Sequence, residues 1–212
     1  MITVHHLENS RSQRVLWLLE ELSVPYTVVR YERNRETMLA PPALRAVHPL
    51  GKSPVIVDDD AAGATRTVAE TGAIIEYVVT RAGGTLGPPN EAEAALHYHH
   101  FLHYAEGSLM PPLLLKLVLS RIPVLGKPAQ KRIQPMIDVH LDFVENELSA
   151  RPWFAGDAFT AADIMMSFPL EAARDRAGLD ASRPATTAWL EKIHARPAYQ
   201  AALAKGGPYK YA

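Results

Sequence analysis

The sequence predicts two domains, an α/β domain with a small mixed sheet over residues 1–82 and an all-helical domain over residues 91–212. Two observations lead to this prediction. Strand-like and helix-like patterns alternate in the first part, whereas only helical periodicity follows residue 90. Between the two parts, residues 83–90 (Gly-Gly-Thr-Leu-Gly-Pro-Pro-Asn) are rich in glycine and proline, which is typical of a linker.

The elements of the first domain follow from local patterns. Strands are expected where β-branched and aromatic residues run together, over residues 2–7, 26–31, 54–57 and 65–68. Helices are expected over residues 12–23 and 71–81, where apolar residues recur every three or four positions, and a weaker one over 36–47. With a turn at residues 58–63, the predicted order is β-α-β-α-β-β-α.

The second domain is predicted from helical stripes of apolar residues. One stripe contains Ala94, Tyr98, Phe101, Ala105 and Leu109, and another contains Ile133, Ile137, Leu141, Val144 and Leu148. Trp189 and Ile193 indicate a later helix that stops at Arg196-Pro197, because proline disfavours helical backbone in the residue before it. The second domain is therefore predicted to be a bundle of helices.

Composition limits the chemistry. Lys and Arg number 22 and Asp and Glu 23, a net charge of −1, so no overall field attracts nucleic acid or an anionic membrane. The chain has no cysteine, which excludes disulfides, thiolate metal sites and a cysteine nucleophile, so reactive sulfur must come from a small molecule. Residues 1–8 lack the pattern of a secretory signal, and the apolar residues 109–119 are too short to span a bilayer. We expect a cytoplasmic protein.

Three local patterns suggest a binding site. The first is Asn9-Ser10-Arg11-Ser12, which precedes a predicted helix whose N-terminus offers unpaired N–H groups and a partial positive charge to an anion. Ser10 could donate its hydroxyl to that anion and Asn9 its amide. The alternative is that Asn9, Ser10 or Ser12 simply caps the helix.

The second pattern is Lys52-Ser53-Pro54 at the start of a predicted strand, and the third is Glu70-Thr71 at the start of a predicted helix. Each also has a purely structural interpretation. A proline at the first position of a strand is often structural, and Thr71 is an ordinary helix cap.

In this order and spacing, the three patterns resemble the glutathione-binding half of a cytosolic glutathione transferase. The C-terminal half agrees, because residues 159–164 (Phe-Thr-Ala-Ala-Asp-Ile) look like the capping box and hydrophobic staple of this superfamily's second domain. In that motif Thr160 caps the helix, Asp163 reaches back and Phe159 packs on Ile164. Arg196-Pro197-Ala198-Tyr199 also resembles the family's C-terminal helix junction. The resemblance covers nearly the whole chain.

The resemblance implies a thioredoxin-like first domain with a cis peptide bond before Pro54. It implies glutathione as a co-substrate and no permanently bound cofactor. By position, the backbone of Ser53 would pair with the cysteinyl part of glutathione, and Lys52 would bind its glycyl carboxylate. Glu70 would bind the γ-glutamyl ammonium group, and Thr71 with its helix N-terminus would hold the α-carboxylate.

The family's acceptor-substrate pocket draws on the region of Tyr104, Glu106 and Met110, although core packing around a bend at Gly107 explains these residues equally well. The partners implied are glutathione, a small hydrophobic electrophile and a second copy of the chain, since the family forms homodimers. His97, His99, His100 and His103 share a predicted helix, but no acidic ligand set completes a metal site, so we expect none.

The family's classes differ in their catalytic residue. The tyrosine type places a tyrosine in the first strand, where this chain has His5 and His6, and the cysteine type requires the missing cysteine. Ser10, four residues before Arg14, reproduces the serine type, with Asn9 the second candidate and Ser12 the third.

The implied activity is attack of the glutathione thiolate on small hydrophobic electrophiles. Two alternatives remain. One is a glutathione-dependent peroxidase or disulfide reductase at the same site, and the other is a non-enzymatic binding or regulatory module with a transferase-like fold.

Overall fold

The computed structural model describes residues 1–59 and 63–211, whose contacts group them into two compact units. Unit one contains residues 1–87 and 194–210, and unit two contains residues 88–193 and Tyr211. Residues 194–210 were expected in the helical domain, but they pack with the first 87 residues. The reason is that the last helix, residues 197–206, packs on the helix of residues 13–21 and the strand of residues 26–31.

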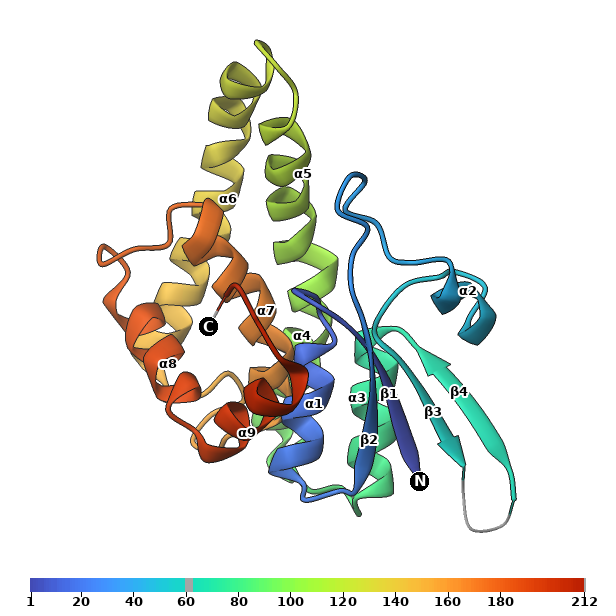
Figure 1. Cartoon of the computed structure of the whole chain (residues 1–212). Helices are drawn as coiled ribbons and strands as arrows, with labels where there is room; N and C mark the ends of the chain where they lie inside the picture. Colours follow the sequence, from blue (N-terminus) through green and yellow to red (C-terminus); the bar gives the residue numbers. More distant parts are fainter. Residues whose placement is uncertain (60–62, 212) are drawn as a thin grey trace. The chain divides into compact units, whose positions relative to one another are not determined.

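Unit one is built on a mixed sheet in which, within the described part of the chain, four strands lie in the order β2-β1-β3-β4 (Figure 1). The strands are β1 (Ile2–Leu7), β2 (Tyr26–Tyr31), β3 (Val55–Asp59) and β4 (Thr65–Ala69). β1 runs parallel to β2 and antiparallel to β3, and β3 runs antiparallel to β4. This is the thioredoxin-like arrangement that the resemblance implied, and the predicted strands are confirmed to within two residues.

Two details of unit one differ from the prediction. Asp58 and Asp59 continue strand β3 instead of starting a turn, and residues 60–62 of the expected turn lie outside the described residues. The helix expected over 36–47 is reduced to α2 (Ala43–Val47). Pro41-Pro42 explains the shorter helix, because the residue before a proline is driven out of the helical region.

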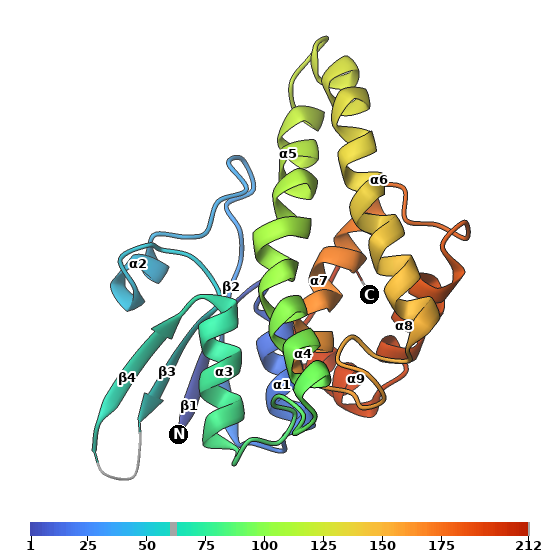
Figure 2. The same cartoon turned by 180° about the vertical axis from the view of Figure 1, so that it is seen from behind.

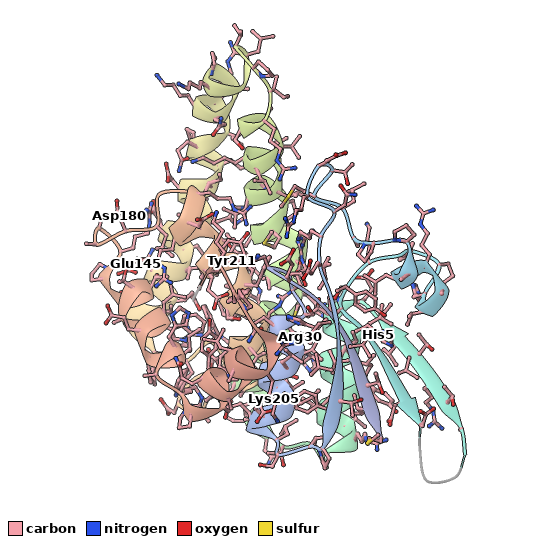
Figure 3. The ribbon with its side chains drawn as sticks, viewed as in Figure 1. His5, Arg30, Glu145, Asp180, Lys205 and Tyr211 are labelled. Carbon is pink, nitrogen blue, oxygen red and sulfur yellow. The ribbon has the colours of Figure 1, made fainter. Side chains whose placement is uncertain are left out.

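The other helices of unit one are α1 (Gln13–Glu21), α3 (Thr71–Arg81) and α9 (Pro197–Gly206). Helices α1 and α3 pack against each other and against the sheet (Figure 2), and α9 packs on α1 and β2. Trp17 of α1 meets Tyr199 of α9 edge to face, with ring centroids 5.2 Å apart. Arg30 of β2 lies beside Lys205 of α9 (Figure 3), and its Nε donates to the Lys205 carbonyl at 2.9 Å.

Side-chain alternation on β1 separates two environments. Thr3 and His5 point to one face, where Thr3 meets Thr27 and the His5 ring lies 2.8 Å from the Tyr31 hydroxyl. Ile2, Val4 and His6 point to the opposite face, because side chains alternate along a strand. All three are buried.

Unit two is helical, as predicted. Its helices are α4 (Ala92–Tyr104), η1 (Ala105–Leu109), α5 (Met110–Ser120), α6 (Gly126–Ala150), α7 (Ala161–Arg176) and α8 (Pro184–His194). Helices α5 and α6 run alongside each other (Figure 1), and α4 packs on α7. Among the helices of residues 1–59 and 63–211, none combines the length and the hydropathy that a membrane-spanning segment requires.

The bend expected near Gly107 takes the form of the π-helix η1, which joins α4 to α5 without a break. Pro111 and Pro112 lie in the first turn of α5. A proline has no N–H to donate and clashes with the carbonyl four residues earlier, so the preceding turn widens to accommodate the pair.

The capping box at the start of α7 is confirmed. The Asp163 carboxylate accepts a hydrogen bond from the Thr160 N–H at 2.9 Å, and Asp163 is fully buried. The Phe159 ring packs against Trp153, with centroids 5.0 Å apart.

Candidate active site

A chain of three buried polar side chains lies at the carboxyl end of β1. Ser10 Oγ is 2.7 Å from Ser12 Oγ, and Ser12 Oγ is 2.9 Å from Nδ1 of His6. The Ser12 N–H also donates to Ser10 Oγ at 3.2 Å. Ser10 is 6% exposed, whereas Ser12 and His6 are 0% and 2% exposed. Ser10 is therefore the member nearest the surface.

The Leu7 N–H connects this chain to the segment that contains Ser53. It lies 3.3 Å from Ser12 Oγ and 3.2 Å from Ser53 Oγ, and Ser53 Oγ donates in turn to the His5 carbonyl at 2.8 Å. The Ser53-Pro54 peptide bond is cis, as the resemblance implied. The predicted residues Ser10, Ser12 and Ser53 are thus brought together at the end of one strand.

The first turn of α1 differs from the expectation. The N–H groups of residues 13–15 donate to the carbonyls of residues 10–12, at 3.2, 3.2 and 3.0 Å. The prediction of unpaired N–H groups was wrong for these three residues, because the preceding loop turns tightly enough to supply its own acceptors. Ser12 occupies the N-cap position without a side-chain capping bond. The capping interpretation of the serines is therefore wrong for Ser12, whose hydroxyl contacts His6 and Ser10 instead.

Asn9 is tied to the C-terminal segment. Its φ is +49°, in the left-handed region that asparagine tolerates. Its Oδ1 accepts a hydrogen bond from the Lys210 N–H at 2.7 Å, and its carbonyl accepts one from Arg33 at 3.3 Å. The carbonyl end of its side chain is therefore engaged away from the serine chain.

The start of α3 is connected to α1 through a buried arginine. Arg14 is 1% exposed, and its Nη2 donates to Oγ1 of Thr71 at 3.3 Å. The N-cap position of α3 is held by Glu70 and Thr71 is the first residue of the helix, so the interpretation of Thr71 as the cap is wrong. Its oxygen instead anchors the guanidinium of Arg14.

Glu70 and Lys52 are both exposed. Glu70 has a φ of +71°, a conformation that costs a non-glycine residue on the order of 1–3 kcal/mol. Strain of this kind persists where surrounding structure enforces it, often at ligand sites. Here it lies directly before Thr71, at the N-terminus of α3.

The His6 imidazole is neutral near neutral pH. Burial lowers its pKa to about 4, with a further contribution from the charge of Arg30, while a hydrogen bond to the Gly206 backbone acts in the opposite direction. Because Nδ1 faces Ser12, the other ring nitrogen carries the hydrogen that the Gly206 carbonyl accepts. Nδ1 is left as an acceptor.

Comparisons with known proteins decide the family. The family described as "Glutathione S-transferase, N-terminal domain" matches residues 10–81, and "Glutathione S-transferase, C-terminal domain" matches residues 109–197. Glutathione S-transferase 3 of Schizosaccharomyces pombe is 36% identical over 97% of this chain and 88% of its own length. The chain belongs to the glutathione S-transferase family. Glutathione S-transferase 1 of Saccharomyces cerevisiae is 34% identical, over 97% of this chain and 95% of its own length.

A solved structure of another relative agrees with the fold of this glutathione S-transferase, and one further relative is named for a different activity. The crystal structure of a glutathione S-transferase from Actinobacillus pleuropneumoniae has a TM-score of 0.87 and 32% identity, covering 100% of this chain and 95% of that one. The Disulfide-bond oxidoreductase YfcG of Escherichia coli is 28% identical, over 97% of this chain and 95% of its own length.

The residues expected to line the acceptor pocket of this glutathione S-transferase belong to unit two, whereas Ser10 belongs to unit one. The Tyr104 hydroxyl is 2.6 Å from Nδ1 of His140, and burial raises the pKa of Tyr104. Met110 is 4% exposed, and Glu106 is half-buried. Their role toward an acceptor stays a prediction.

The histidines of α4 have different surroundings. His99 and His103 are exposed, whereas His97 lies against Arg151 and near Glu147 of α6. Among residues 1–59 and 63–211, no group of three or more His, Cys, Asp or Glu side chains is placed to hold a metal ion.

Sequence reasoning missed the position of His6 within the site of this glutathione S-transferase. The signal was present, since His6 shares the period-2 face of Ile2 and Val4, which marks a buried position for a polar ring. What the pattern could not reveal is the partner, because the turn at residues 8–12 decides that Ser12 meets the ring.

Proposed function

We propose that this glutathione S-transferase uses the Ser10 hydroxyl to stabilise the thiolate of bound glutathione, which then attacks small hydrophobic electrophiles. The observation that supports this proposal most is the convergence of Ser12 and Ser53 on the Leu7 amide at the end of β1, with the Ser10 hydroxyl 2.7 Å from that of Ser12. A cysteinyl group paired with the backbone of Ser53 would place its sulfur near Ser10. Asn9 is the second candidate donor, but its side-chain oxygen is engaged with Lys210.

The energy required is modest. A free thiol has a pKa of about 8.5, so only a few per cent is thiolate at pH 7. Lowering that pKa by roughly 2 units requires about 2.7 kcal/mol of preferential thiolate stabilisation. A hydrogen bond to a charged group supplies about 1.5–3 kcal/mol, and the dipole of α1 adds a smaller contribution. In the reaction the thiol proton leaves to solvent, a sulfur–carbon bond forms, and the leaving group departs with its electron pair.

The remaining groups would hold the glutathione backbone at both ends. Lys52, exposed beside Ser53, suits the glycyl carboxylate as a point charge. Glu70 suits the γ-glutamyl ammonium group. Thr71, at the N-terminus of α3 and hydrogen-bonded to Arg14, suits the α-carboxylate.

The acceptor would be a small apolar molecule contacted from the region of Tyr104, Glu106 and Met110. We also propose, from the family, that the chain forms a homodimer and acts in the cytoplasm. Sedimentation at micromolar concentration tests the dimer directly, since a monomer mass would contradict it.

Disulfide reduction is the competing activity. We consider it because a relative that is 28% identical is named a disulfide-bond oxidoreductase. The chain contains no cysteine, so glutathione would have to provide every thiol of that exchange. For this reason we favour conjugation.

The experiment is a sequence of three measurements on the purified chain. Retention on immobilised glutathione tests the binding site. Conjugation of chlorodinitrobenzene and glutathione-dependent reduction of bis-hydroxyethyl disulfide then compare the two activities. Faster conjugation supports the proposal, faster disulfide reduction replaces it with the competing activity, and retention without either turnover identifies a binding module.

A further inference from the structure

The hydrogen atoms of the His6–Ser12–Ser10 chain can be assigned from its acceptors. The His6 ring gives its one N–H to the Gly206 carbonyl, so Nδ1 faces Ser12 with a lone pair. A second acceptor, the Leu7 carbonyl, lies 3.3 Å from Ser12 Oγ. Both acceptors belong to residues of strand β1.

Ser12 has only one hydroxyl hydrogen to give. Nδ1 of His6, at 2.9 Å, takes it in preference to the more distant carbonyl, and in either case it is not available to Ser10. Ser12 Oγ can therefore only accept from Ser10. The 2.7 Å contact between the two hydroxyls requires a hydrogen between them, which Ser10 must supply.

We infer that Ser12, oriented by His6, is a positioning residue that holds the Ser10 hydroxyl hydrogen turned inward and competes for it with the sulfur of glutathione. The inference rests on the proposed role of Ser10. While the thiol is protonated, Ser10 donates to Ser12 and presents a lone pair outward. When the thiolate forms, the Ser10 hydrogen must turn to the sulfur.

This reorientation has a cost in the wild-type protein. Once Ser10 donates to sulfur, two oxygens face each other at 2.7 Å with no hydrogen between them, unless Ser12 abandons His6. Either outcome loses one neutral hydrogen bond in the thiolate state alone. Removing the Ser12 hydroxyl removes the competition, so the pKa of the bound thiol falls.

The size of the fall follows from the net value of a neutral hydrogen bond. It corresponds to roughly half to one pKa unit, a thiol about three- to ten-fold more acidic. A Ser12 with a purely structural role predicts no such gain in acidity, since disordering Ser10 weakens thiolate binding.

The test is a double-mutant cycle on the full chain, using Ser10→Ala, Ser12→Ala and the double variant. The pKa of bound glutathione is read from thiolate absorbance in difference spectra with and without glutathione, across pH. Ser12→Cys is the volume-matched second variant, because a thiol is a weak acceptor. Ser167→Ala is the control, since Ser167 is a buried serine of α7 whose hydroxyl donates to the Ile164 carbonyl of the same helix at 2.9 Å.

The expected result is a lower thiol pKa in Ser12→Ala that disappears in the Ser10→Ala background, with Ser167→Ala unchanged. An unchanged or higher pKa in both Ser12 variants overturns the inference, and so does a fall that persists without Ser10. If Ser10→Ala alone leaves the pKa unchanged, the proposed role of Ser10 fails, and that outcome is distinct from the first two.

Discussion

Arg196 and Glu21 form a two-point ion pair, with Nε 2.6 Å from Oε1 and Nη2 2.8 Å from Oε2. The pair joins the N-cap position of α9 to the last residue of α1, across 175 positions of sequence. A planar guanidinium matched to a carboxylate is among the stronger polar contacts in proteins. At the other end of α9, Lys205 pairs with Glu20. The last helix is therefore fastened to the helix that follows the Ser10 loop.

Replacing Arg196 by alanine should reduce the free energy of unfolding of the chain by about 1–3 kcal/mol, since Glu21 is 10% exposed and would lose its positively charged partner. Chemical denaturation followed by tryptophan fluorescence measures the change, because Trp17 hydrogen-bonds Glu21 and meets Tyr199 edge to face. Arg121→Ala, an exposed arginine at the end of α5, is the matched control. Equal stability of the two variants would show that the pair contributes nothing.

The α9 contacts also show where sequence reasoning stops. The helix break at Arg196-Pro197 was predictable from proline geometry, and the capping box at Thr160 and Asp163 from a four-residue pattern. Both signals are local. The packing of α9 on α1 depends on residues 175 positions apart, and no spacing rule on one chain connects them.

Asp163→Asn should flatten part of the pH dependence of stability. Burial raises the pKa of Asp163 to about 6, although hydrogen bonds from Thr160, Phe154 and Trp189 lower it. The folded chain thus binds this proton more tightly than the unfolded chain, whose aspartate titrates near pH 4. The stabilisation from this proton is complete below about pH 4 and is lost as pH rises through about 6.

The magnitude of that loss is on the order of 2–3 kcal/mol between pH 4 and pH 7. Urea denaturation of both proteins at several pH values isolates it, because only the difference between wild type and Asp163→Asn is used. Asp157→Asn, an exposed aspartate of the same segment, should retain the wild-type profile. A wild-type pH profile in Asp163→Asn would mean that Asp163 does not titrate in this range.

Glu70→Gln and Lys52→Met should each raise the KM for glutathione, by roughly five- to ten-fold for the loss of one charged contact, with kcat nearly unchanged. The reason is that these side chains would bind the ends of glutathione equally well before and during reaction. Glu76→Gln, at an exposed position of α3, and Lys127→Met, at an exposed position of α6, are the matched controls. A fall in kcat at constant KM would show that these residues act in the chemical step and not in glutathione binding.

The residues of the candidate site could be predicted from the sequence, whereas most of their hydrogen bonds could not. Ser10, Ser53 and Thr71 stand at strand and helix ends, where local pattern places them. The Leu7 amide shared by Ser12 and Ser53 depends on strand β1 meeting two loops from different parts of the chain. His6 was visible only as a buried polar position, since its partners come from α1 and α9.

The proposed mechanism depends most on Ser10 as the donor to the glutathione sulfur. Its direct test is the pKa of the bound thiol, measured by thiolate absorbance against pH in the wild type and in Ser10→Ala. We expect a wild-type pKa roughly 2 units below that of free glutathione and a rise of about 1–2 units in the variant. An identical thiol pKa in the two proteins would contradict it.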